Sequence, residues 1–219
     1  MSRSLKHASP PRRAEKKALS RRRIVAAARE VFFRDGFMEA NLDEVAKRAG
    51  VAKGTLYRYF DSKAELYVAV LAHNGDIFAE KMRDSVKDGR CSAPDLIRRL
   101  GRFYFDHWMQ NPEYFQIFWA IENQRVIGEL PPGVTEEVTS LWETCVGQLA
   151  AIIERGVAEG HFAPCDPWEV ANILWTLANG LIQTESSPAR RGLRRRELDA
   201  TFTDAVDLVI RGLAVAHAR

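Results

Sequence analysis

The sequence is poor in cysteine and contains no long apolar run. Its 219 residues include three cysteines, Cys91, Cys145 and Cys165, whose wide spacing matches neither a zinc site nor a disulfide framework. We therefore expect reduced thiols in a cytoplasmic protein, with a redox-sensing cysteine as the alternative. No segment approaches the ~20 apolar residues of a membrane-spanning helix, and the charged N-terminus lacks the apolar stretch of a secretory signal. We expect no membrane partner.

The motifs of the common enzyme classes are missing as well. The sequence has no G-x-S-x-G, no H-E-x-x-H and no glycine-rich phosphate loop. His73, His107 and His161 have no paired acid or nucleophile at a telling spacing. These absences predict a protein that is not an enzyme and holds neither a cofactor nor a metal ion.

Positive charge is concentrated at the N-terminal end of the chain. Residues 1–63 contain 16 Lys and Arg against 7 Asp and Glu, a net charge of +9, whereas residues 64–219 contain 16 against 22, a net charge of −6. This division is expected when only the N-terminal part meets nucleic acid. Residues 1–19 are basic with little apolar content and predict a disordered arm. The arm is either a solubilising tail or a segment that follows DNA.

Two short helices are predicted around a glycine turn. Apolar residues share one face of the first helix at Ile24, Ala27, Ala28, Val31 and Phe32. We expect Ser20 to cap its start and Gly36 to end it. The second helix begins at Asn41, and Glu44 lies three residues later, where it can complete a capping box. Gly50 then marks a sharp turn, because glycine adopts a positive φ without steric cost.

A third helix, predicted from Ala52 to Tyr59, has one apolar face and one basic face. Leu56 and Phe60 point one way. The opposite face is formed by Lys53, Gly54, Tyr57 and Arg58. Such a face suits a major groove lined by phosphates. We expect Asp61 to cap the following helix and Lys63, in its first turn, to bind a phosphate.

Residues 24–66 resemble the DNA-binding domain of the tetracycline-repressor (TetR) family of bacterial regulators. The likeness rests on Ala-Gly-Val, then Lys-Gly-Thr-Leu-Tyr-x-Tyr-Phe, then x-Ser-Lys-x-x-Leu, which span residues 49–66. The resemblance implies a phosphate contact by Lys63. It implies base or DNA-backbone contacts by Asn41, Lys53, Gly54, Thr55, Tyr57 and Tyr59, and the basic face adds Arg58. This chain has Asn41 where the family usually has threonine, and Asn41 can still cap the helix. It has Ala52 where the family usually has serine, and an alanine N-cap forgoes about 1 kcal/mol of helix stability.

The remainder of the chain is predicted to be helical, so the fold class is all-α. We expect a three-helix helix-turn-helix domain at residues 20–66 and an effector-binding and dimerisation domain at 67–219. The later helices are predicted at about residues 62–87, 94–109, 112–123, 134–158, 167–184 and 193–216, with a loop at 128–133. This gives about nine helices, which is the family's usual number. Asp166 and Pro167 mark one helix start, as N-cap and first helical residue.

The last two helices are predicted to form a homodimer interface. The helix over residues 167–184 is apolar on two sides, and such a helix must be covered on both. One side would face the core and the other a second subunit. The expected interface residues are Leu177, Leu181, Phe202, Val206, Val209 and Ile210. A twofold dimer also suits a palindromic operator in double-stranded DNA.

Aromatic residues are dense in the middle of the chain and predict an apolar pocket with a few polar anchors. The candidate ligand-binding residues are Phe103, His107, Phe115, Trp119, Trp142, Gln148, Asn172, Trp175 and Asn179. Aromatics at helical spacing also serve simply as core. The resemblance implies a repressor that a small apolar or aromatic effector releases from DNA. An activator, an enzyme, and a helical scaffold with a vestigial helix-turn-helix are the alternatives.

Overall fold

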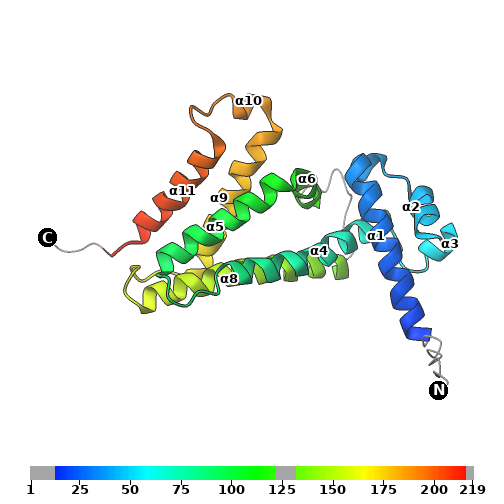
Figure 1. The fold of residues 1–219 in the computed structure, drawn as a ribbon, viewed down its shortest axis with the longest axis horizontal. Coiled ribbons are helices and arrows are strands. Elements are labelled where there is room, and N and C mark those ends of the chain that lie inside the picture. Colours follow the sequence, from blue (N-terminus) through cyan, green and yellow to red (C-terminus); the bar gives the residue numbers. More distant parts are fainter. Residues whose placement is uncertain (1–12, 122–131, 216–219) are drawn as a thin grey trace, which may run out of the picture. The chain divides into compact units, whose positions relative to one another are not determined.

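The computed structural model describes residues 13–121 and 132–215, which are helical almost throughout. The elements are α1 (Arg13–Glu39), α2 (Leu42–Ala49), α3 (Lys53–Leu56), α4 (Lys63–Ser85), α5 (Ala93–Gln110), α6 (Pro112–Ile121), α8 (Pro132–Ala158), α9 (Pro167–Gln183), η1 (Thr184–Ser186), α10 (Pro188–Arg191) and α11 (Leu198–Leu213) (Figure 1). Within these ranges the only extended pairing is a bridge between Phe162 and Ala214. The predicted all-α class is therefore confirmed. The described ranges hold ten α-helices rather than nine, because the single turn α10 precedes α11.

The described chain divides into two compact units. Residues 13–71 and 117–121 belong to the first unit, and residues 72–116 and 132–215 belong to the second. In the first unit α1 packs along α2, and α3 follows α2 (Figure 1). The fully buried side chains Ile24, Val31, Val45 and Leu56 form its centre. Helix α2 therefore has one face on α1, and its apolar residues follow the predicted spacing.

Helix α1 differs from its prediction at both ends. It begins at Arg13 rather than Ser20, so residues 13–19 are helical and not a disordered arm. Residues 1–12 of the predicted arm lie outside the described residues. Gly36 has φ 73° and ψ 176°, a conformation essentially restricted to glycine, and it kinks the helix where the end was predicted. One further turn then leads to Glu39.

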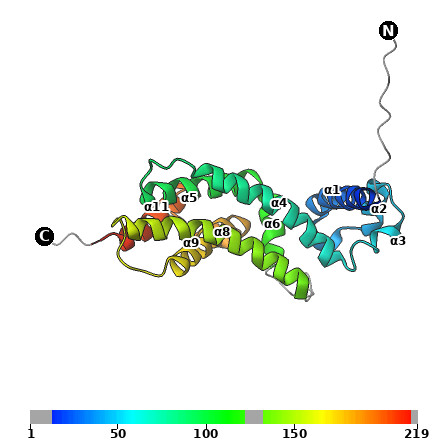
Figure 2. The same cartoon turned by 90° about the horizontal axis from the view of Figure 1, so that it is seen from below.

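Helices α5, α8, α9 and α11 pack on one another in the second unit (Figure 2). Ion pairs join α5 to α11, with Arg98 Nε 2.7 Å from Asp207 and Arg102 paired with Asp199. Gly156 lets another element approach α8, because a Cβ there would lie 2.3 Å from the Phe162 ring. The loop that carries Phe162 is also joined to the end of α11, since Ala163 N donates to Leu213 O at 2.8 Å.

Most predicted boundaries in the second unit are confirmed. Asp166 caps α9, accepting from the amide of Trp168 at 2.9 Å, and Pro167 is the first helical residue. The last helix is a correction, since it begins at Leu198 rather than Leu193. Of the predicted loop at 128–133, the first four residues lie outside the described ranges and the last two begin α8. None of the helices in the described ranges is long and apolar enough to cross a membrane.

The three cysteines are free thiols. Cys145 is buried in α8, and burial raises the pKa of its thiol to about 12, because a buried thiolate loses its hydration. Cys91 and Cys165 are half-buried. Cys145 is therefore an inert core residue rather than a reactive thiol.

We predict that Gly50→Ala destabilises α2 through two separable effects. Gly50 has φ 65°, which costs an alanine about 1–2 kcal/mol. An added Cβ would also lie 2.5 Å from Arg23 Nη2, so the guanidinium would have to leave the Ala49 carbonyl. Hydrogen exchange of the α2 amides reports this local stability. The loss should exceed 2 kcal/mol in the wild-type background and fall to about 1–2 kcal/mol in Arg23→Gln.

Candidate nucleic-acid interface

Asn41 and Gly50 stand at the two ends of α2, as the sequence predicts. The Asn41 side chain accepts from the amide of Asp43 at 2.8 Å, which confirms the N-cap. Gly50 is left-handed, and its amide and that of Val51 close the helix end on Lys47 O and Ala46 O. Arg23 of α1 donates from Nη2 to Ala49 O at 2.5 Å, which satisfies another carbonyl at this end.

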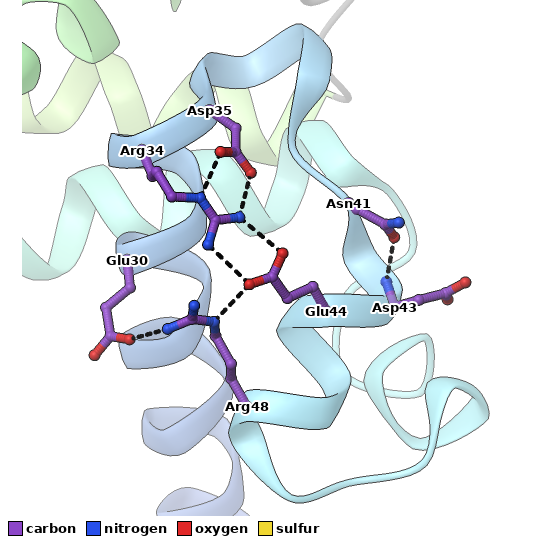
Figure 3. A network of polar contacts seen from close by, with 7 residues as sticks. All are labelled: Glu30, Arg34, Asp35, Asn41, Asp43, Glu44 and Arg48. Carbon is purple, nitrogen blue, oxygen red and sulfur yellow. Dashed lines mark hydrogen bonds and ion pairs between the residues drawn. The ribbon is translucent and has the colours of Figure 1, made fainter.

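Glu44 does not complete a capping box as predicted. Its carboxylate instead accepts from Arg34 of α1, at 2.7 and 2.9 Å, and from Arg48 Nε at 2.8 Å (Figure 3). Arg48 also meets Glu30 at 3.0 Å, and Arg34 meets Asp35 at 2.6 Å. Hydrogen bonds from Arg34 and then Arg48 lower the pKa of Glu44 to about 2. These contacts join α1 to α2 on the solvent side.

Helix α3 is a short element held by its neighbours. It spans Lys53–Leu56, and the turn continues as Tyr59 N donates to Leu56 O at 2.9 Å. Within the described residues no side chain caps its start at Ala52, as the alanine there predicts. The helix is secured by the buried side chains of Leu56 and Phe60. Arg21 of α1 lies over the Phe60 ring, 5.1 Å from its centroid.

The outer face of α3 carries the predicted reading residues. Lys53, Gly54, Tyr57 and Arg58 are exposed, whereas Thr55 and Tyr59 are half-buried. Apart from Gly54 itself, its chain neighbours and its own helix backbone, no described atom lies within 4 Å of a Cβ built on Gly54, and Gly54 does not have a positive φ. The chain's own packing therefore does not require a glycine there. Its missing side chain leaves room for an external backbone or base to approach.

Lys63 is oriented by the first unit itself. Its Nζ donates to Met38 O at 2.8 Å and lies 5.2 Å from the Phe37 ring centroid. Partial burial lowers the pKa of its ammonium. The N-cap of α4 is Ser62, whose hydroxyl accepts from the amide of Glu65 at 3.0 Å, and not Asp61 as predicted. The side chain of Lys63 is thus held beside the start of α2 rather than left free in solvent.

An open hollow brings the main candidates of the first unit together. It has a volume of about 460 Å³ and is lined by Glu39, Ala40, Asn41, Leu42, Asp43, Lys53, Tyr57 and Lys63. Four of the predicted DNA-contacting residues share it, although they come from α3, from the start of α4 and from the N-cap of α2. Asp43, which the sequence analysis did not select, pairs with Lys53 at 2.7 Å. The sequence signal that could have identified Asp43 is its position in the first turn of α2, two residues after the N-cap Asn41.

The aromatic residues of the second unit form a packed cluster rather than an open pocket. Phe78 lies 4.7 Å from His107 and 5.7 Å from Phe103, between ring centroids. Burial lowers the pKa of His107. Phe115 packs edge-on against Trp108 at 5.5 Å. These three candidates, Phe103, His107 and Phe115, are thus largely accounted for as core.

A small apolar cavity lies beside this cluster. Its volume is about 40 Å³, and it is lined by Met82, Ile97, Leu100, Gly101, Tyr104, Leu149, Leu174, Trp175, Ala178, Phe202 and Val206. Trp175 is the only predicted ligand residue in this lining. Asn179 is buried close by and accepts from Tyr104 Oη at 2.6 Å. A cavity of this size is well below the ~300 Å³ of an ordinary ligand site.

The remaining pocket candidates are scattered. Gln148 is half-buried, and its Nε2 donates to Ala79 O at 3.0 Å. Trp142 is half-buried on α8, and Trp119 is half-buried on α6, one helical turn after Phe115. Asn172 is a correction, because it is exposed on α9 and lines no described cavity. Of the nine residues, only Trp175 lines the described cavity beside Tyr104, and a common site for the others stays a prediction.

Three of the six predicted interface residues are turned inward. Phe202, Val206 and Ile210 are 4%, 8% and 5% exposed within a single chain, and Phe202 lies 4.9 Å from the Phe105 ring of α5. The inner face of α11 was therefore mistaken for its outer one. Leu177, Leu181 and Val209 are half-buried. The exposed large apolar side chains of α9 and α11 are Trp168 (44%), Ile173 (56%) and Leu208 (62%), which the prediction omitted.

The chain is similar to known regulators. Residues 24–70 match the family described as bacterial regulatory proteins, tetR family. The HTH-type transcriptional activator FasR of Mycolicibacterium smegmatis is 32% identical over 135 residues, which are 62% of this chain and 59% of FasR. The HTH-type transcriptional repressor NicS of Pseudomonas putida is 30% identical over 153 residues, 68% of this chain and 69% of NicS.

The fold is shared with solved structures as well. The transcriptional regulator FadR from Bacillus subtilis, in complex with stearoyl-CoA, matches with a TM-score of 0.67 at 19% identity over 88% of this chain and 98% of FadR. The fold and the exposed face of α3 define a helix-turn-helix, DNA-binding regulator rather than an enzyme. Within that class, the chain belongs to the TetR family of transcriptional regulators.

We predict that Glu44 titrates with a pKa of about 2 in the folded protein. Because this pKa lies below the ~4.3 of an unfolded chain, the network stabilises the first unit at higher pH. That contribution is lost as the pH falls from ~4.3 through about 2. NMR titration of the carboxyl carbon checks the value. Arg34→Gln should raise it, whereas Arg58→Gln, outside the network, should not. A wild-type value near 4 would contradict the assignment.

Proposed function

We propose that this regulator binds a palindromic operator as a homodimer, with residues 20–66 as the DNA reader. The observation that carries the proposal is the exposed basic face of α3. Lys53, Tyr57 and Lys63 line one hollow, and Gly54 leaves the surface beside it open. Donors of this kind serve phosphates and guanine edges. Arg58 extends the face, and the half-buried Thr55 and Tyr59 have only their outer edges available.

The second part of the proposal is the dimer. Ile173 of α9 and Leu208 of α11 are exposed, and both are large apolar side chains. Helices α9 and α11 pack on each other through their inner faces, which leaves their outer faces for a second copy. Leu177, Leu181 and Val209, which are half-buried, can complete that surface. A twofold axis then presents two reading helices to the two halves of a palindrome.

The third part is control by a small apolar effector in the cytoplasm. The residues 67–219 would supply its site, and the cavity beside Tyr104 and Trp175 is lined almost entirely by apolar groups. Because its volume is only about 40 Å³, the effector must widen it by moving neighbouring helices. The buried Oε1 of Gln148 has no hydrogen-bond partner among the described residues, and it would serve as a polar anchor if the widened cavity reaches it, since Gln148 is not in the present lining. FadR, which shares the fold, holds stearoyl-CoA, whose acyl chain is apolar and whose CoA part is charged.

Effector and operator must oppose each other by the same factor, because coupling between binding sites is reciprocal. We expect the effector's affinity to fall about 5- to 150-fold when operator is present. Calorimetric titration of candidate effectors with and without operator measures this. A compound that binds equally well in both cases is not the effector.

The direction of regulation is a separate question. NicS is a repressor, whereas FasR is an activator. We propose repression, and a promoter–reporter assay with and without the protein distinguishes the two.

The DNA-binding prediction concerns Lys63 and Tyr57. An operator is first selected from random duplexes with the purified protein. Lys63→Ala should then weaken binding to all sequences alike and reduce the salt slope by about one, as the loss of a phosphate contact does. Tyr57→Ala should weaken operator binding by about 1–3 kcal/mol and random DNA by less. Lys87→Ala, in the second unit, is the control. Unchanged operator affinity in both test variants would refute the proposed interface.

The dimer prediction concerns the outer faces of α9 and α11. Ile173→Asp together with Leu208→Asp should weaken self-association at least ~100-fold, because carboxylates buried without partners cost several kcal/mol. Both positions are exposed in the single chain, so helicity should be retained. Met109→Asp, at an exposed apolar position on α5, is the control. Sedimentation equilibrium measures the effect. A double variant that stays dimeric would place the interface elsewhere.

A further inference from the structure

Asp43 places a negative charge on a surface that otherwise attracts DNA. It lies in the first turn of α2 and meets the first residue of α3, with 2.7 Å between its Oδ1 and Lys53 Nζ. Both side chains are 58% exposed, and both line the hollow with Asn41, Tyr57 and Lys63. An ion pair this exposed contributes little to stability. The fold therefore has no strong need for the acid, whereas a phosphate near it would be repelled.

The chemistry of a carboxylate narrows what Asp43 can contact on DNA. It is an acceptor only. In the major groove the donors are the amino groups of cytosine N4 and adenine N6. Lys53 is a donor only. Its hydrogen bond to the Asp43 carboxylate raises the pKa of its ammonium. The acceptors that suit it are guanine O6 and N7. The pair thus offers a donor next to an acceptor, held on two different helices.

We propose that Asp43 and Lys53 together read one G·C base pair in each half-site, with Lys53 donating to guanine and Asp43 accepting from cytosine. The major-groove edge of this base pair shows two adjacent acceptors and then one donor. An A·T pair alternates acceptor, donor and acceptor. An ammonium at adenine N7 would therefore face the N6 amino group, and a carboxylate at N6 would face thymine O4. Only the G·C order satisfies both side chains without such a conflict.

The ion pair also directs Lys53 away from non-specific contacts. A free lysine has a flexible stem and binds any phosphate as a point charge. Asp43 holds that ammonium toward the start of α2, in the hollow that Tyr57 also lines. The pair thereby gives up some general affinity and gains discrimination between base pairs. This inference rests on the proposed function, because it assumes that α3 faces DNA.

The experiment selects sequences from a random duplex library with the wild type, Asp43→Asn and Asp61→Asn. Asp61 is exposed in the same unit, so its variant removes an equal charge without touching Lys53. The wild type and Asp61→Asn should select G·C at one position in each half-site, and replacement of that pair by A·T should weaken binding about 10- to 100-fold. Asp43→Asn should lose most of this discrimination while the other positions stay unchanged, because its amide can donate to thymine O4 as well as accept from cytosine N4. Its salt slope on random duplex should increase by about one, since Lys53 is released to a phosphate.

A modified operator tests direct contact. Cytosine at the assigned position is replaced by 2-pyrimidinone, which lacks the N4 amino group. The wild type should lose affinity, whereas Asp43→Ala, which has no acceptor at this position, should not. Circular dichroism verifies that each variant is folded. If the wild type selects a palindrome and Asp43→Asn shows the same discrimination at every position, the pairing with cytosine is wrong while the proposed function stands. If the wild type selects no sequence, both the inference and the proposed function fail.

Discussion

The left-handed turn at Gly50 is the constraint on which the reading surface depends. It ends α2 and reverses the chain so that α3 begins three residues later, at Lys53. The turn is closed by two amides on α2 carbonyls and by Arg23 reaching across from α1 to Ala49 O. A side chain at residue 50 would meet that guanidinium at 2.5 Å. The orientation of α3 relative to α2 therefore depends on Gly50 and Arg23 together.

Helix α3 illustrates how little of a recognition element is stable by itself. Four helical residues cannot form a stable helix in water, because nucleation is costly. Leu56 and Phe60 attach it to the core, and Arg21 covers the Phe60 ring. The opposite side of α3, with Lys53, Gly54, Tyr57 and Arg58, is exposed and does not contribute to the core. Part of the basic N-terminal charge thus serves the fold: the side chains of Arg21 and Arg23 hold α2 and α3 and are not simply a DNA-attracting tail.

The second unit uses its aromatics mainly to fill space. Phe78, His107 and Trp108 are in mutual ring contact, and Tyr104 donates to Asn179 in the core. A small cavity bounded partly by α11 lies beside these aromatics. An effector that enlarges it must shift α5, α9 or α11 against one another. Because α9 and α11 also carry the exposed Ile173 and Leu208, the same movement would alter the proposed dimer surface. Sensing and assembly would then share the same helices.

The sequence by itself determined the all-helical class, the caps at Asn41 and Asp166, the turn at Gly50 and the basic face of α3. These features are local, since each depends on residues within one or two helical turns. Tertiary structure decided the rest. Periodicity shows that α11 has an apolar stripe but not which neighbour covers it, so Phe202 and Val206 were assigned to a partner instead of to α5. It also could not show that Glu44 would meet Arg34, ten residues away, or that Asp43 would meet Lys53. Long charged side chains choose among several partners at similar free energy, and only the packing of the helices brings one of them within reach.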